Sequence, residues 1–366
     1  MSRERSRRRS LVARAALLSA SVLVAVLIGE GAFRAYLAAG AVEAPRDDSE
    51  WRARYRHMNE TLYKRSDVPG LVYEPRPGAA VEMEYGLASF NGAGMRDTRE
   101  FDEEPGDQRR VVMIGDSLVW SEFVALEDSL PRQVEHALAS PDEVVMNFGV
   151  SGYDTAQEAL WYERGARRFQ PDVVVVVYCL NDMMIMSGPS NRYADEQEQR
   201  RTEEQDQMFD RLAPVRRETL DQVNRRDEEM ATFKLFARVR SLWRRAAFAR
   251  RYVDEYTIAA EQPERFAAVE AGLGRLGRTI ADDGARGLLV ISPVLESWDR
   301  YHWTHIHEVV ARAGRRAGFD VLDPLEAWQD THEPSRLRVP GDNLHYNPRG
   351  NQLLGETIAA AIEEPR

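Results

Sequence analysis

The feature that most constrains the fold is the run DVVVVVYCL at 172–180, which is apolar at nearly every position. A strand with one face in water alternates apolar and polar residues, whereas a strand covered on both faces does not need to. The run therefore predicts a buried strand in a parallel sheet that carries helices on both sides.

Strands and helices alternate along the chain from residue 111 onward. Five strands are expected, at 111–115, 143–149, 172–180, 287–293 and 319–324. Helices are expected within ALEDSLPRQVEHALAS, TAQEALWYERGARRF, HIHEVVARAGRRAG and PRGNQLLGETIAAAIEE. This order is typical of an α/β domain with three layers, α/β/α, around a mostly parallel five-stranded sheet.

Two further segments surround or interrupt this pattern. Residues 41–110 are mixed, with several Gly and Pro and short β-like pieces, and are interpreted as an extension that packs on the main domain at 111–366. A helical insertion at about 183–262 separates the third and fourth strands. Its part at 233–252 carries seven Lys or Arg and no acid among aromatic residues, which predicts a lid or a membrane-contacting helix. The alternative is a helix that packs its aromatic side chains on the domain.

The first forty residues differ from the rest of the chain. MSRERSRRRS is strongly cationic, and an uncharged run of 15 residues follows at 15–29. Extended beyond Glu30, the run is long enough to cross a bilayer, and the preceding arginines predict a cytoplasmic N-terminus. Residues 1–40 are therefore expected to form a cytoplasmic tail and a single transmembrane helix, with the remainder extracytoplasmic. A cleaved signal peptide is the alternative, because Ala-rich sequence follows the run.

Composition excludes several classes of protein. With 60 acidic against 49 basic residues the net charge is -11, so a nucleic-acid partner is not expected, because neutralising phosphates needs clustered Lys and Arg. Cys179 is the only cysteine, which excludes an internal disulfide and a Cys-rich zinc module, and it is expected to be a buried small hydrophobe. His302, His305 and His307 raise the question of zinc, but no H-E-x-x-H motif accompanies them. Neither a metal nor a cofactor is expected.

Polar residues follow four of the strands, at the edge where parallel sheets form their sites. Ser117 follows the first strand in GDS, Gly152 the second in NFGVSGYDT, and Asn181 the third in LND, while Asp342 and His345 follow the last in DNLH. Acyl transfer through a serine requires this set: a hydroxyl nucleophile, an imidazole base held by a carboxylate, and donors for an oxyanion.

Ser117 is therefore the predicted nucleophile, His345 its base, and Asp342 the carboxylate that holds the imidazole. The predicted oxyanion donors are the backbone amides of Ser117 and Gly152 and the side-chain amide of Asn181. Gly152 suits this role because a residue without Cβ lets the backbone approach the reacting centre.

Structural roles are the alternative for several neighbouring residues. Asp116 is typical of a helix N-cap, and Asp154 and Gln157 are interpreted as the start of a helix. Ser151 is a rival nucleophile, but Tyr153 stands where the G-x-S-x-G motif requires its second glycine.

These four blocks resemble those of the SGNH (GDSL) hydrolase superfamily, in which Ser, Gly, Asn and His occur in this order. The similarity covers about 111–362, and FNGAGMRD at 90–97 resembles the lead-in segment of membrane-anchored members. The third block departs from the family's G-x-N-D, because Cys179 stands in place of the glycine. The resemblance implies a flavodoxin-like α/β/α fold and an esterase that acts through an acyl-serine.

Three functions are compatible with this resemblance. The first is an extracytoplasmic serine esterase that cleaves an O-acyl ester of a lipid or an acylated glycan. The second is an O-acetyltransferase that uses the same residues to acylate an extracellular polysaccharide, so that only the acceptor differs. The third is a catalytically silent glycan-binding protein, which would be expected to lack a member of the triad, and none is missing here.

Overall fold

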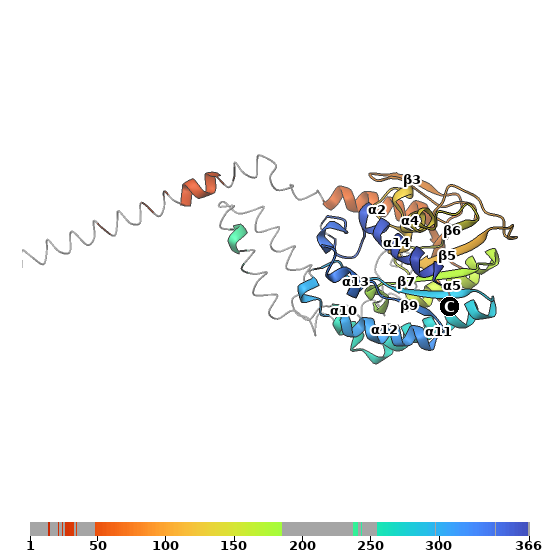
Figure 1. The fold of residues 1–366 in the computed structure, drawn as a ribbon. Coiled ribbons are helices and arrows are strands. Elements are labelled where there is room, and N and C mark those ends of the chain that lie inside the picture. The colour runs from red at the N-terminus through yellow and green to blue at the C-terminus, as the bar shows by residue number, and fades with distance from the viewer. Residues whose placement is uncertain are drawn as a thin grey trace, which may run out of the picture. The chain divides into compact units, whose positions relative to one another are not determined.

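The computed structural model describes residues 48–184, 255–296, 298–340 and 342–364, with scattered positions at 14–34 and 237–243. By its internal contacts the chain divides into two units. One consists of Met1–Trp51 and Asp210–Asp254, and the other of Arg52–Phe209 and Glu255–Arg366. Nearly all the described residues belong to the second unit (Figure 1).

A five-stranded sheet forms the centre of the second unit, and all its strands are parallel. They are β5 (Arg109–Gly115), β6 (Glu143–Asn147), β7 (Val173–Tyr178), β8 (Arg286–Ile291) and β9 (Asp320–Leu322). Their order across the sheet, β6-β5-β7-β8-β9, is that of a flavodoxin-like doubly wound fold. The predicted five-stranded parallel sheet is confirmed, and the predicted strand ends lie within about two residues of those observed.

Helices cover both faces of this sheet (Figure 1). The longer helices after β5, within the described residues, are α4 (Leu130–Leu138), α5 (Thr155–Arg164), α11 (Pro263–Asp282), α12 (Thr304–Arg316) and α14 (Pro348–Glu363). Val174 and Val176 belong to an apolar core with α5, α11 and α12, whereas Val175 and Val177 belong to a second core with α4 and α14. Strand β7 is apolar throughout because each of its faces contacts one of these cores. The expected three layers are confirmed.

The other helical elements that the structure describes from Ser117 onward are short. They are α3 (Ser117–Trp120), α10 (Glu255–Ala260), α13 (Leu325–Gln329), η1 (Leu126–Asp128), η2 (Ala166–Phe169), η3 (Leu180–Met183), η4 (Trp298–Arg300) and η5 (Pro334–Arg336). Helix α3 follows β5 and the 3-10 turn η3 follows β7, so both begin at the carboxyl edge of the sheet.

The segment before the sheet contains one helix and two antiparallel hairpins. The helix is α2 (Asp48–Leu62), and the hairpins pair β1 (Tyr63–Arg65) with β2 (Tyr73–Pro75) and β3 (Ala80–Met83) with β4 (Gly86–Ser89). Strands β2, β3 and β4 lie within the expected β-like pieces, whereas β1 and α2 are not among the expected elements. Its buried Met58 and Leu62 lie in the same apolar core as Val112 of β5, so this segment shares a core with the sheet.

Most of the expected anchor at 1–40 and most of the expected insertion at about 183–262, including nearly all of 233–252, lie outside the described residues. Within the part of the chain that is described, no helix combines the length and the apolar character needed to cross a bilayer.

Candidate active site

Ser117 lies at the carboxyl end of β5, where the chain turns into helix α3. The side chain of Asp116 accepts a hydrogen bond from the N–H of Leu118 at 2.9 Å and so caps this helix. A side chain at Gly149 would place its Cβ against the backbone nitrogen of Trp120. Glycine there lets the loop after β6 pass directly beside α3, and Ser117 is held in this crowded turn with 7% of its surface exposed.

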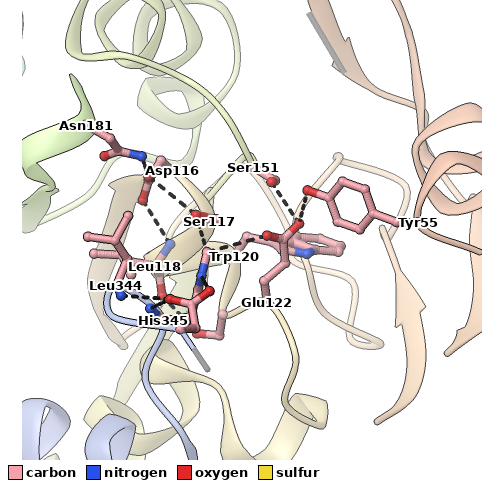
Figure 2. Close-up of polar contacts among 12 residues, drawn as sticks. Tyr55, Asp116, Ser117, Leu118, Trp120, Glu122, Ser151, Asn181, Leu344 and His345 are labelled. Carbon is pink, nitrogen blue, oxygen red and sulfur yellow. Dashed lines mark hydrogen bonds and ion pairs between the residues drawn. The ribbon is translucent and has the colours of Figure 1, made fainter. Parts of the chain in front are cut away.

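His345 lies beside Ser117, although 228 residues separate the two in sequence (Figure 2). Nε2 of His345 is 2.8 Å from the Ser117 hydroxyl, and Nδ1 is 2.8 Å from Oδ2 of Asp342. The other oxygen of Asp342 accepts the backbone N–H groups of Leu344 at 2.7 Å and His345 at 2.9 Å. The D-x-x-H spacing thus forms a turn that holds the carboxylate against the imidazole. Three predicted side chains form one continuous hydrogen-bonded chain.

The charges around His345 favour its protonated form. Burial alone would lower the pKa of His345, but the hydrogen bond to Asp342 and the negative charges of Asp342, Glu122 and Asp116 raise it to about 9. Burial would likewise raise the pKa of Asp342, yet the hydrogen bond and charge of His345 and two backbone N–H groups lower it to about 2. At neutral pH the two residues therefore form an imidazolium–carboxylate pair, and the basic form of His345 predominates only at alkaline pH.

Gly152 and Asn181 lie at the same edge of the sheet, after β6 and β7. Gly152 has φ +80°, a left-handed conformation that glycine adopts without strain. Asn181, in η3, donates from its side-chain nitrogen to Oδ2 of Asp116 at 3.1 Å, and this bond uses one of its two amide hydrogens. The Ser117 hydroxyl lies 3.4 Å from the same Asp116 oxygen. Asp116 therefore connects Asn181 to Ser117, a role beyond the expected N-cap.

Three residues near the site have structural roles that the sequence indicates. Cys179 is buried, with φ -111° and ψ 148°, an extended conformation that does not require the glycine of the family pattern. Asp154 accepts the N–H of Gln157 at 2.9 Å, and Gln157 accepts the N–H of Asp154 at 3.1 Å. This pair is a capping box that begins α5.

A second carboxylate, that of Glu122, approaches the nitrogen of His345 that faces Ser117. Oε2 of Glu122 is 3.5 Å from Nε2 of His345. Oε1 accepts hydrogen bonds from the Tyr55 hydroxyl and the Ser151 hydroxyl, both at 2.9 Å (Figure 2). Burial raises the pKa of Glu122, and the charge of His345 and these two hydrogen bonds oppose the rise. Ser151, the rival nucleophile, thus donates to a carboxylate and not to a histidine.

Neither Glu122 nor Tyr55 is identified by the sequence analysis. The only signal for Glu122 is a charged residue within the otherwise mostly apolar stretch LVWSEFV. Tyr55 lies on α2, far from every block of the motif.

Hydrogen bonds from the segment that precedes the sheet hold the loop after α3 in place. Arg96, which is 1% exposed, donates to the carbonyl oxygens of Ser121 at 2.6 Å and Val124 at 2.7 Å. Ser121 and Phe123 have φ 60° and 69°, a conformation that costs energy in residues with a side chain and is found at functional sites. The ring of Phe123 lies edge-on to that of His345, with centroids 5.0 Å apart.

The three histidines of HWTHIHE do not converge. His307 is buried, with Nδ1 2.9 Å from Asp323 and Nε2 2.6 Å from the hydroxyl of Tyr301. Nδ1 of His305 lies 3.1 Å from the carbonyl oxygen of His302. Among the described residues, no group of three or more His, Cys, Asp or Glu side chains is arranged to hold a metal ion.

Comparison with known proteins places these residues in context. The model of the GDSL-like Lipase/Acylhydrolase family matches residues 113–353, which contain all five predicted site residues and leave 52–110 outside. A search of curated protein sequences gave no significant match.

Several solved structures are similar to the chain at low identity. Axe2, an acetylxylan esterase from Geobacillus stearothermophilus, is 17% identical over 71% of this chain and 96% of its own, with a TM-score of 0.42. A lipase/acylhydrolase from Enterococcus faecalis is 16% identical over 71% of this chain and 99% of its own, with a TM-score of 0.39. LAE5, an alpha/beta hydrolase enzyme from the metagenome of Lake Arreo, Spain, is 16% identical over 69% and 94%, with a TM-score of 0.42.

Proposed function

Since the chain belongs to the GDSL-like lipase/acylhydrolase family and is therefore a serine hydrolase that acts on esters, we propose that it cleaves an O-acyl ester of a lipid or an acylated glycan. The observation that carries the proposal is the hydrogen-bonded chain from Ser117 through His345 to Asp342, with both links at 2.8 Å. A nucleophile, a base and an orienting carboxylate in this arrangement are what an acyl-serine mechanism requires.

In the proposed first half-reaction, the Ser117 oxygen attacks the ester carbonyl carbon while Nε2 of neutral His345 accepts the hydroxyl proton. Asp342 holds the Nδ1–H and stabilises the imidazolium that forms. The imidazolium then gives its proton to the oxygen of the leaving alcohol, and the acyl group stays on Ser117. Water repeats these steps in reverse roles and releases the acid.

The proposed oxyanion donors are the backbone N–H groups of Ser117 and Gly152 and the side-chain amide of Asn181. Donors fixed in advance stabilise the charge of the tetrahedral intermediate without rearranging during the reaction. The bond from Asn181 to Asp116 is consistent with this role, because it holds the amide next to Ser117 before substrate binds.

A fluorophosphonate probe tests the nucleophile. The probe is expected to label Ser117 and to lose its target in Ser117→Ala. Ser117→Ala and His345→Ala are each expected to abolish ester turnover with little change in melting temperature, and the double variant should be no worse than either one, because residues that act in one step are non-additive. Labelling that survives Ser117→Ala would place the nucleophile elsewhere.

We also propose that the catalytic domain lies on the outer side of the cytoplasmic membrane, anchored through residues 1–40. The proposal rests on the arginine-rich start and the uncharged run at 15–29. A reporter that is active only outside the cytoplasm, fused after Arg366, is expected to be active. Activity of a reporter that functions only in the cytoplasm would contradict this topology.

A further inference from the structure

We propose that Glu122 selects water over alcohols as the acyl acceptor, by holding the hydrolytic water against His345. The inference rests on the proposed function, because it concerns the second half-reaction at the same site. It adds to that function a specificity for the acceptor, which the triad alone does not provide.

The first step is the position of the carboxylate. Oε2 of Glu122 and the Ser117 hydroxyl lie 3.5 Å and 2.8 Å from the same nitrogen, Nε2 of His345 (Figure 2). In the acyl-enzyme the Ser117 oxygen carries the acyl group and no proton, so Nε2 needs a new donor. Two acceptors 3.5 Å apart can share one water oxygen, since hydrogen bonds of about 2.8 Å reach both from a single point.

The second step is the number of hydrogens on the acceptor. Water donates one hydrogen to Nε2 of His345 and the other to Oε2 of Glu122. An alcohol has one hydroxyl hydrogen, so once it donates to His345 its carbon substituent must occupy other directions around the oxygen, and Oε2 of Glu122 receives no hydrogen bond from the acceptor. A charged oxygen that loses its hydrogen-bond donor in a buried site is costly. The arrangement therefore favours water.

The chemistry balances without any further reactant. The water oxygen forms a bond to the acyl carbon as its first proton moves to Nε2 of His345. The second hydrogen stays on that oxygen and remains hydrogen-bonded to Glu122. The bond between the acyl carbon and the Ser117 oxygen then breaks, and the proton on Nε2 passes to that oxygen. The products are the carboxylic acid and the free serine.

The third step is how firmly the carboxylate is held. Glu122 is 3% exposed, and its Oε1 accepts from both Tyr55 and Ser151, so that the other oxygen is directed at His345. Arg96 fastens the loop on the two sides of Glu122 through the carbonyl oxygens of Ser121 and Val124. Because both the carboxylate and the neighbouring backbone of Glu122 are held in this way, its Oε2 can bind water at one defined position.

The test is the partition of one acyl-enzyme between two acceptors. The intact chain is supplied with p-nitrophenyl acetate and increasing methanol, and the ratio of methyl acetate to acetate is measured. Because both products arise from the same intermediate, the ratio depends on neither the rate of acylation nor the amount of folded protein. Glu122→Gln is expected to raise the ratio about tenfold, as when one hydrogen bond to a charged group is lost.

Matched variants complete the experiment. Glu127→Gln, an exposed glutamate five residues further on, should leave the ratio at the wild-type value. Tyr55→Phe and Ser151→Ala keep the carboxylate but loosen it, and should raise the ratio by a smaller factor. If Glu122→Gln turns over too slowly for the product ratio to be measured, these two variants test the inference instead. An unchanged ratio in all three overturns the inference, even if their pH profiles shift, because Glu122 would then act on His345 by charge alone. A wild-type chain that releases no nitrophenol would instead contradict the proposed function.

Discussion

At the scale of single residues, His345 has a carboxylate at each ring nitrogen: Asp342 at Nδ1 and Glu122 near Nε2. Both carboxylates stabilise the imidazolium, and so they lower the free energy of each state of the reaction in which His345 is protonated. The same charges hold the proton on the free enzyme, where it must be absent for His345 to act as a base. The two carboxylates therefore stabilise the charged intermediate, but they also lower the fraction of the enzyme in which His345 is neutral near pH 7.

The pH dependence of turnover follows from this conflict. The pKa of His345 is raised to about 9, so the fraction of neutral imidazole, and with it kcat/KM for a non-ionising ester, is expected to rise about tenfold per pH unit below that value and to level off above it. Initial rates from pH 6 to 10, corrected for spontaneous hydrolysis, measure the profile. A plateau already reached at pH 7 would show that the charges of Asp342 and Glu122 do not control His345.

Variants of Asn181 test whether its side-chain amide is an oxyanion donor or only part of the turn after β7. If its amide donates to the developing charge, Asn181→Ala should lower kcat by about 10² to 10³ and change KM little, because the bond forms mainly in the transition state. Asn181→Asp should be at least as damaging, since a carboxylate would then face both that charge and Asp116, now 3.1 Å from the amide. A folded Asn181→Ala protein with near wild-type kcat would remove Asn181 from the site.

At the scale of elements, the sheet could be predicted because strand and helix patterns are local. The apolar run at 172–180 predicts the sheet, and the polar blocks after four of its strands place Ser117, Asn181 and His345 at one edge, since parallel strands end there together. Glu122 was not predictable, because its loop is shaped by tertiary contacts. Two of its residues have left-handed backbones without being glycine, and the loop is held by Arg96 from outside the motif.

Helix α5 and the turn η3 bury two further carboxyl groups, those of Glu158 and Asp182. Within the described part of the chain neither oxygen of Glu158 has a hydrogen-bond partner, while Asp182 accepts from Thr155 at 2.9 Å. Burial is the largest cause that raises both pKa values well above the ordinary range. The charges of Asp116 and Asp154 add to it at Glu158, and those of Glu158 and Asp116 add to it at Asp182. The folded state therefore retains protons that the unfolded chain releases above pH about 4.

Stability should consequently fall as pH rises through the neutral range, because the unfolded chain binds fewer protons than the native one. Glu158→Gln keeps the shape and removes the ionisation, so its melting temperature should decline less between pH 5 and pH 9 than that of the wild type. Glu326→Gln, at an exposed position of α13, is the matched control and should leave the decline unchanged. Equal slopes for Glu158→Gln and the wild type would mean that this pair does not set the pH dependence.

At the scale of the whole molecule, the catalytic unit extends beyond the region that the family model matches. Residues 52–110 precede that region, yet they contribute Tyr55 to the Glu122 carboxylate and Arg96 to the loop that carries it. They also complete one of the two apolar cores of the sheet. The segment is thus part of the same folded body, and Arg96 belongs to its stretch FNGAGMRD at 90–97, which resembles a lead-in segment of the superfamily.

Two truncations test this dependence. A chain that starts at residue 48 keeps α2 and is expected to retain the wild-type kcat/KM for p-nitrophenyl acetate. A chain that starts at residue 105 keeps the whole family match but loses fully buried Met58, Leu62, Tyr63 and Tyr73. At about 1.5–3 kcal/mol for each large apolar side chain, that loss is comparable with the total stability of a domain, about 5–15 kcal/mol. The shorter chain should therefore lack a cooperative thermal transition, and circular dichroism with and without heating would show it.

Arg96→Met separates the apolar contribution of the segment from its hydrogen bonds, since it keeps most of the apolar contact but not the hydrogen bonds to Ser121 and Val124. It should still unfold cooperatively, at a lower temperature, with a reduced kcat. A residue-105 chain that unfolds cooperatively and turns over the ester normally would show that the segment is dispensable.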